Sequence, residues 1–129
     1  MLVLLDTTVL IDYLRGRPVV RRVDTLRRQG DVACTTAINV EEVVRGLRPH
    51  EKTAAGGLFD GLGIIPLGRA EGDQAGAWRR VFAGRGVTLS QADCLIAAAA
   101  RSAAAGLATG NPAHFPMTEL TVEHWPVGE

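Results

Sequence analysis

The stretch SQADCLIAAAARSAAAGLAT at residues 90–109 joins a long helical pattern to a short apolar run. Residues 90–105 are predicted to form a helix that begins at Ser90 and stops at Gly106, because serine and glycine are common at those helix boundaries. The helix is apolar on nearly all sides, which is typical of a buried helix. The run Leu107-Ala108-Thr109 that follows is predicted to be a strand. A buried helix leading into a buried strand indicates an α/β fold.

Short apolar strands and helical segments alternate along the rest of the chain in the same way. Leu2 to Leu5 is a continuous apolar run stopped by Asp6, which is typical of a parallel strand buried on both faces. Further strands are expected at residues 32–34, 63–67, 107–109 and 120–122. Helices are expected at residues 9–14, 19–29, 40–47, 51–61, 70–83 and 90–105. The alternation predicts an α/β fold with a central parallel sheet of four to five strands and helices on both faces.

Length and composition indicate one soluble domain that spans residues 1–129. Hydrophobic residues make up 47% of the chain, which is enough for a core and too much for a disordered chain. The 14 basic and 14 acidic residues give a net charge of +0, which excludes a strongly basic protein that coats nucleic acid. The longest strongly apolar run, residues 95–100, is far shorter than the ~20 residues of a membrane span. The two cysteines form no disulfide or metal pattern and no signal peptide is visible, so a cytoplasmic location is expected.

Polar residues stand where ligands bind in open α/β sheets, at the carboxyl ends of the strands. Asp6 directly follows the first strand, Thr109 ends the fourth, and Asn111 comes two residues later. Glu42 lies in the helix after the second strand, and Asp93 lies in the first turn of the long buried helix. Converging carboxylates without a lysine or histidine partner suit a hard divalent cation such as Mg²⁺ or Mn²⁺.

Two of these carboxylates also have a purely structural interpretation. Asp6 could cap the helix that follows it, because aspartate is a preferred N-cap residue. Ser90 and Asp93 form the Ser-x-x-Asp pattern of a capping box. Asp93 nevertheless opens an almost wholly apolar helix and is therefore expected to be buried. A buried charge is costly unless a metal ion or a full set of hydrogen-bond donors compensates it.

Glu41 and Glu42 are distinguished by the residues four positions further along their helix. Glu41 is followed at this spacing by Arg45, which is the favourable order for an exposed ion pair. Glu42 is followed at the same spacing by Gly46, which leaves room for another element to approach. Glu42 is therefore the preferred site residue of the two.

Other polar or reactive side chains have simpler interpretations. Asp12 is expected in solvent on the outer part of the first helix, and Cys94 is expected to be a small buried apolar residue. Six arginines fall within residues 15–28. They form either a solvated helix face or a contact for phosphate groups, which the forked guanidinium suits well.

Four segments carry the candidate site residues in order along the chain. They are residues 6–14 (DTTVLIDYL), 42–46 (EVVRG), 93–98 (DCLIAA) and 107–115 (LATGNPAHF). Together they resemble the motifs of PIN-domain ribonucleases of the VapC toxin family, at family-like spacing over nearly the whole chain. In the fourth segment, Asn111 matches a position that is Asp in some members, and His114 replaces the Asp common before the phenylalanine. Both departures reduce the negative charge of that motif, which weakens the case for a second firmly held metal ion and leaves open whether one or two ions bind.

The resemblance implies an α/β/α PIN-like fold and endoribonuclease activity that depends on Mg²⁺ or Mn²⁺. The expected metal ligands are the residues at the acidic motif positions, Asp6, Glu42 and Asp93. Asn111 is the fourth catalytic candidate. Water and ligands around the ion are expected to be oriented by the neighbouring hydroxyl residues Thr7, Thr8 and Thr109.

The resemblance also implies partners. A toxin of this kind pairs with a VapB-like antitoxin, forms a homodimer, cleaves RNA and inhibits translation or growth, while it meets DNA only through the antitoxin and has no contact with a membrane. The candidates for contact with RNA phosphates are Arg15, Arg45 and Arg48. The alternative is a PIN-fold protein-binding module, or a degenerate nuclease with little catalytic activity.

Overall fold

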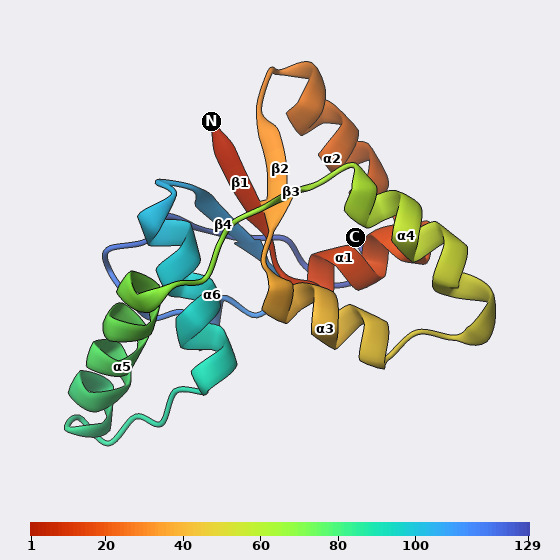
Figure 1. Ribbon diagram of the computed structural model, residues 1–129. Helices are drawn as coiled ribbons and strands as arrows, with labels where there is room; N and C mark the ends of the chain where they lie inside the picture. Colours follow the sequence, from red (N-terminus) through yellow and green to blue (C-terminus); the bar gives the residue numbers. More distant parts are fainter.

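A parallel sheet forms the centre of the molecule (Figure 1). The computed structural model describes all residues, 1–129, and contains one five-stranded sheet in the order β3-β2-β1-β4-β5. The strands are β1 (Leu2–Leu5), β2 (Val32–Thr35), β3 (Gly63–Ile64), β4 (Gly106–Thr109) and β5 (Val122–His124). Every neighbouring pair is parallel, so the carboxyl ends of all strands meet at one edge. The prediction of a parallel sheet of four to five strands is confirmed.

Helices cover both faces of this sheet, as Figure 1 shows. They are α1 (Thr7–Leu14), α2 (Val19–Arg28), α3 (Ala37–Arg45), α4 (Lys52–Asp60), α5 (Arg69–Ala83) and α6 (Gln91–Ser102), with short 3₁₀ turns η1 (Pro49–Glu51) and η2 (Pro112–His114). Leu4 of β1 packs into a core with α5 and α6, whereas Val3 and Leu5 pack into a second core with α1 and α2. Successive side chains of a strand point to opposite faces, so a continuously apolar strand supplies both cores. The predicted three-layer α/β/α fold is confirmed.

The two edge strands differ from the sequence expectation. β3 stops before residue 67, where the expected strand ended. Ile65 still donates its backbone N–H to the carbonyl of Thr35, but Pro66 has no N–H with which to extend the ladder. β5 lies two residues later than expected, since its pairing with β4 begins at Val122, while Leu120 packs against the core in the segment before it.

The buried helix α6 ends three residues before the expected boundary at residue 105. Ala104 adopts a φ of 52°, in the left-handed region that usually belongs to glycine. The chain changes direction at Ala104, and β4 begins two residues later at Gly106. Gly106 therefore marks the start of the strand, whereas the reversal that ends the helix occurs at an alanine.

Two expectations about exposure are wrong. The helical spacing of Val40, Val43, Val44 and Leu47 predicts one apolar stripe, yet Val44 is 51% exposed, while Val43 fills the core. Asp12, expected in solvent, is 3% exposed, because the C-terminal segment of the chain lies over α1. The Asp12 carboxylate pairs with Arg17 and accepts the backbone N–H of Gly128 at 2.8 Å. The latter contact joins the two ends of the chain, so local periodicity cannot predict it.

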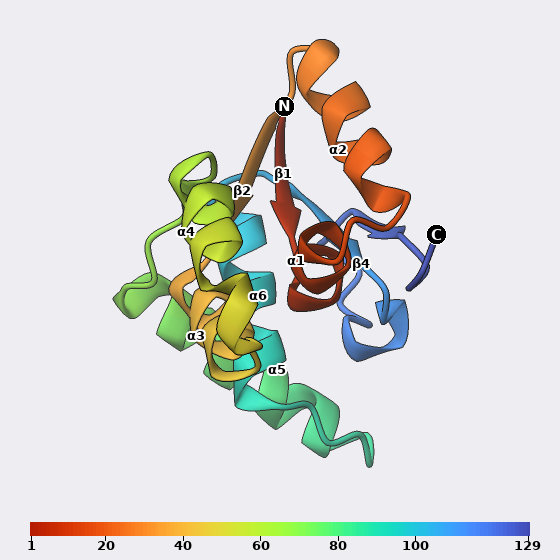
Figure 2. The same ribbon diagram turned by 90° about the vertical axis from the view of Figure 1, so that its right-hand side faces the viewer.

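The topology gathers polar residues at one edge of the sheet. Figure 2 shows β1 running from the N-terminus into α1, so residues 6–8 lie at the carboxyl end of the central strand. β2 and β4 flank β1, which brings Thr36 and Thr109 to the same edge. No helix in the molecule is both long enough and apolar enough to cross a membrane.

Candidate functional site

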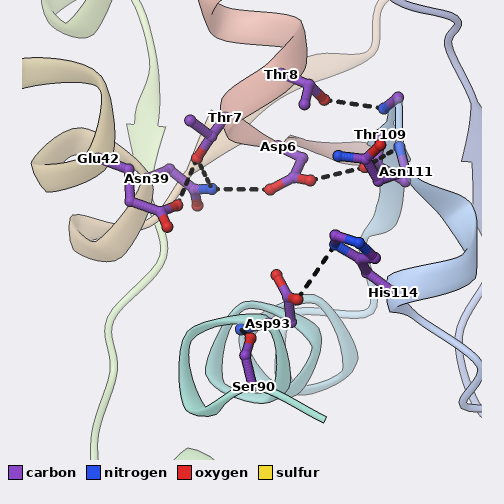
Figure 3. Close-up of polar contacts among 11 residues, drawn as sticks. Asp6, Thr7, Thr8, Asn39, Glu42, Ser90, Asp93, Thr109, Asn111 and His114 are labelled. Carbon is purple, nitrogen blue, oxygen red and sulfur yellow. Dashed lines mark hydrogen bonds and ion pairs between the residues drawn. The ribbon is translucent and has the colours of Figure 1, made fainter. Parts of the chain in front are cut away.

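Asp6 is the central residue of the site and is only 6% exposed (Figure 3). It occupies the N-cap position of α1, yet its side chain makes no capping hydrogen bond, so the capping interpretation is wrong. The Thr109 hydroxyl donates to Asp6 Oδ2 at 2.7 Å, and Asn39 Nδ2 donates to Asp6 Oδ1 at 3.2 Å. Side chains from α3 and from the end of β4 therefore fix this one carboxylate.

The charge on Asp6 is unfavourable in its surroundings. Burial raises the pKa of the Asp6 carboxyl, while the Thr109 hydrogen bond and the Thr7 backbone N–H act in the opposite direction. The negative charges of Asp93 and Glu42 raise the pKa further. Three carboxylates therefore act on one another at this edge of the sheet, and a bound cation would relieve their repulsion.

Glu42 is held by the residue next to Asp6. The Thr7 hydroxyl donates to Glu42 Oε1 at 2.7 Å, and Asn39 Nδ2 donates to Thr7 Oγ1 at 3.0 Å. Glu41, by contrast, points to solvent and pairs with Arg45 at 3.6 Å, as the sequence predicted. The preference for Glu42 over Glu41 is consistent with this arrangement.

Asn39 belongs to the site, although the sequence analysis did not select it. Its side chain is completely buried, and its amide orientation is fixed because the Thr36 hydroxyl donates to Asn39 Oδ1 at 2.7 Å. The Asn39 Nδ2 group therefore faces Asp6 and Thr7. Two signals could have identified it: the Thr36-x-x-Asn39 capping spacing, and its position four residues before Val43 on the buried face of α3.

Asp93 approaches the site from the other side of the sheet, on α6. Ser90 caps this helix, since its hydroxyl accepts the Asp93 backbone N–H at 3.0 Å. The Asp93 carboxylate points away from Ser90 to His114, whose Nδ1 lies 3.4 Å from Asp93 Oδ2 (Figure 3). The side chain is 25% exposed, more open than predicted. The next residue, Cys94, is fully buried, and burial raises the pKa of its thiol, as suits a small core residue.

The loop after β4 closes the site through backbone contacts. Thr109 Oγ1 accepts the Asn111 backbone N–H at 3.0 Å, and Thr8 Oγ1 accepts the Gly110 N–H at 2.9 Å. A Cβ atom at Gly110 would lie 2.8 Å from Val127 Cγ2 and 3.1 Å from Thr8 Oγ1, so any larger residue there would have to displace these side chains. Asn111 lies in the site, but its exposed side chain makes none of these hydrogen bonds.

The three arginine candidates differ in their surroundings. Arg15 and Arg48 line an open groove at the C-terminal end of α1, together with Arg17, His50 and Glu51, whose carboxylate lies 4.0 Å from Arg15 Nε. Arg45 lies outside this groove. Because α1 is eight residues long, the groove lies roughly 12 Å along the helix from its acidic end. Arg15 and Arg48 therefore lie in one groove, whereas Arg45 does not.

The acidic side chains fit a divalent ion that keeps much of its water. No three His, Cys, Asp or Glu side chains converge closely enough to enclose an ion. Mg²⁺, however, is usually held by one or two carboxylates and several waters. A fixed, buried aspartate with two further carboxylates in electrostatic reach supplies oxygen ligands of this kind. The donor chemistry therefore fits Mg²⁺ or Mn²⁺.

Known proteins resemble this chain in sequence and in fold. The family model of the PIN domain matches residues 3–116. Ribonuclease VapC19 of Mycobacterium tuberculosis is 31% identical over 120 residues, which cover 88% of this chain and 92% of the relative. Ribonuclease VapC10 of the same organism is 32% identical over 121 residues, which cover 92% and 89%.

Solved structures show the same fold. The match to VapBC2 from Rickettsia felis, bound to a DNA fragment from its promoter, has a TM-score of 0.82 at 21% identity and covers 97% of this chain and 99% of that chain. The match to DNA-bound VapBC from Salmonella typhimurium has a TM-score of 0.82 at 23% identity and covers 97% and 99%. These matches agree with the resemblance that the four sequence motifs predicted.

Proposed function

This chain belongs to the PIN domain family, and on that premise we propose that it is a divalent-metal-dependent endoribonuclease, the toxin of a VapBC-type pair. The observation that carries the proposal is the fixed, buried Asp6 with Asp93 and Glu42 in electrostatic reach at the carboxyl edge of the sheet. The ribonuclease names of its relatives support cleavage of RNA as the reaction.

The acidic residues would hold the ion, and their neighbours would keep them in place. Asp6 and Asp93 would bind Mg²⁺ or Mn²⁺ directly or through its waters, with help from Glu42. When bound, such an ion supplies an activated water and stabilises the charge that develops on the scissile phosphate. Thr109 and Asn39 each hold one oxygen of Asp6, so the carboxylate is oriented before any ligand arrives.

The hydroxyl residues around the carboxylates act as positioning residues in this proposal. Thr7 orients Glu42, and Thr8 ties the loop after β4 to the start of α1. Asn111 keeps its side chain free at the mouth of the site, where it can orient water or a substrate oxygen.

RNA contact is assigned to the groove at the far end of α1. Arg15 and Arg48 present guanidinium groups there, which suit the phosphates of an RNA strand that crosses the acidic site. Both tryptophans, Trp78 and Trp125, are buried, so they offer no platform for stacked bases. Recognition of a folded RNA by its shape fits this surface better.

The partners are proposed from the VapBC structures that this chain resembles. The solved VapBC structures contain an antitoxin beside the toxin, which supports a VapB-like antitoxin for this chain. We assign DNA contact to that antitoxin rather than to this chain. We further propose that residues 1–129 form one domain, that two copies form a homodimer, and that the protein acts in the cytoplasm to inhibit translation or growth.

The test is RNA cleavage by the purified full chain. A structured RNA should be cut in the presence of Mg²⁺ or Mn²⁺, left intact with a chelator, and cut again when excess metal is restored. The products should carry 5′-phosphates. An intact RNA under all conditions, together with no Mn²⁺ binding, would support the alternative of a non-catalytic PIN-fold binding module. Cleavage unaffected by the chelator would contradict the metal assignment.

A further inference from the structure

His114 is the nitrogen donor placed beside the acidic site. It ends the short turn η2, and its Nδ1 lies 3.4 Å from Oδ2 of Asp93. Figure 3 shows the imidazole reaching toward Asp93 on the side of the site where Asp6 and Asn111 lie. Among the three histidines of the chain, only His114 has a carboxylate oxygen within 4.0 Å. The fourth sequence motif contains His114, and the fold brings it beside Asp93 of the third motif.

The turn that carries His114 is well anchored. The His114 backbone N–H donates to the carbonyl of Asn111 at 3.0 Å, and Phe115 donates to the carbonyl of Pro112 at the same distance. Phe115 is 3% exposed and belongs to the core, whereas the His114 side chain is 57% exposed. The backbone position is therefore fixed by neighbours, while the imidazole remains accessible to a ligand.

The spacing of His114 and Asp93 is close to that of two neighbouring ligands of one ion. A charge-assisted N–H···O hydrogen bond is about 2.7–2.9 Å long, shorter than the 3.4 Å between Nδ1 and Oδ2. Two neighbouring ligands of an octahedral ion, each about 2.1 Å from it, lie about 3 Å apart. Small side-chain rotations at the exposed His114 would reach that separation.

We propose that His114 is a nitrogen ligand of the divalent ion and that it makes the site prefer transition-metal ions such as Mn²⁺ over Mg²⁺. The inference rests on the proposed metal-dependent function. Mg²⁺ takes oxygen ligands almost exclusively, whereas imidazole nitrogen suits first-row transition metals. The neutral ring also adds a ligand without adding a fourth negative charge to Asp6, Glu42 and Asp93.

The test is Mn²⁺ binding by the full chain, followed by electron paramagnetic resonance. Pulsed spectra of bound Mn²⁺ should show coupling to a directly bound ¹⁴N nucleus in the wild type and in His50→Asn, and no such coupling in His114→Asp. In competition titrations, His114→Asp should lower the preference for Mn²⁺ over Mg²⁺ on the order of tenfold. Circular dichroism should show the same fold for all variants, because the His114 side chain is exposed.

Two results would overturn the inference in distinguishable ways. Bound Mn²⁺ without nitrogen coupling, or an unchanged metal preference in His114→Asp, would contradict the role of His114 alone. Absence of any Mn²⁺ binding by the wild type would overturn both this inference and the proposed metal-dependent function.

Discussion

The negative charge of Asp6 lowers the stability of the metal-free fold, although the proposed function needs that charge to hold a metal ion. Its pKa is raised because burial and the nearby negative charges of Asp93 and Glu42 disfavour the ionised form. When the pKa of a carboxyl group is higher in the folded state than in the unfolded state, the free energy of unfolding falls as the pH rises above the unfolded-state pKa. This cost disappears as the pH falls below the ordinary aspartate value of 3.8, where both the folded and unfolded states are protonated.

Replacing the charge should therefore stabilise the metal-free protein. In the presence of a chelator at pH 7, Asp6→Asn should raise the melting temperature by roughly 2–5 °C. The gain should shrink as the pH is lowered through the raised pKa of Asp6 and should vanish below the ordinary value. Thermal melts from pH 3 to pH 7 measure this, with the exposed Glu41→Gln as a control that changes little. A lower melting temperature for Asp6→Asn at pH 7 would contradict the account.

Asn39 supports the site from inside the fold. Asn39→Ala removes the donor to Asp6 and Thr7 and leaves the Thr36 hydroxyl without its acceptor. The variant should lose about 1–3 kcal/mol of unfolding free energy and should also cleave RNA more slowly. Urea denaturation measures the loss. Asn111→Ala, which removes no side-chain hydrogen bond, should change stability by less than about 0.5 kcal/mol. Equal losses in the two variants would refute the role of Asn39.

The sequence predicted the acidic residues better than the residues that hold them. Asp6 follows β1 directly and Asp93 lies in the first turn of α6, where topology alone brings side chains to one edge, and Glu42 was selected by the spacing along its own helix. Asn39 and Asp12 are polar side chains buried by elements far away in the chain. The capping spacing marks Asn39 locally, but its hydrogen bond to Asp6 spans 33 positions and the contact of Asp12 with Gly128 spans 116, so local spacing does not predict these partners.

At the scale of elements, periodicity predicted which segments are helices and strands but not where each one ends. β3 is cut short by a proline that cannot donate to the ladder, and α6 ends at Ser102, two residues before Ala104, a non-glycine residue in the left-handed region. At such ends the packing of the whole fold decides where an element stops. For α6, the chain has to turn early enough for β4 to begin in register with β1.

The close contact between the β4 loop and α1 can be tested at Gly110. Gly110→Ala would push a methyl group against Val127 and Thr8, which should cost about 1–3 kcal/mol of unfolding free energy and lower RNA cleavage. Gly56→Ala on α4 is the matched control. Its added methyl meets nothing within 4 Å, so it should be neutral or stabilising by up to about 1 kcal/mol. Similar stability of the two variants would argue against the contact.

Across the whole molecule, the net charge of +0 conceals two separate charged regions. Carboxylates gather at the start of α1, and arginines line the groove at its other end. An enzyme that holds a cation and a polyanion needs both regions, and α1 sets the distance between them. A net charge of zero over the whole chain is therefore compatible with an RNA substrate.

The arginine groove should control the electrostatic part of RNA binding. In the Asp93→Asn background, which should prevent cleavage, replacing Arg15 and Arg48 together by glutamine should weaken RNA binding. It should also reduce the slope of log affinity against log salt by roughly 0.7 for each phosphate that the groove no longer neutralises. Arg45→Gln should have a smaller effect, because Arg45 lies outside the groove. Binding titrations at several salt concentrations measure both quantities, and an equal effect of Arg45→Gln would contradict the groove assignment.

The central claim is that the carboxylates at the carboxyl edge of the sheet hold the ion that drives RNA cleavage. The most direct measurement is the RNA cleavage rate of Asp93→Asn in saturating Mn²⁺, beside the wild type and the exposed control Glu41→Gln. Asp93→Asn should lose at least about a hundredfold in rate while it retains the wild-type circular dichroism spectrum, and Glu41→Gln should cleave like the wild type. Cleavage by folded Asp93→Asn at the wild-type rate would contradict the account.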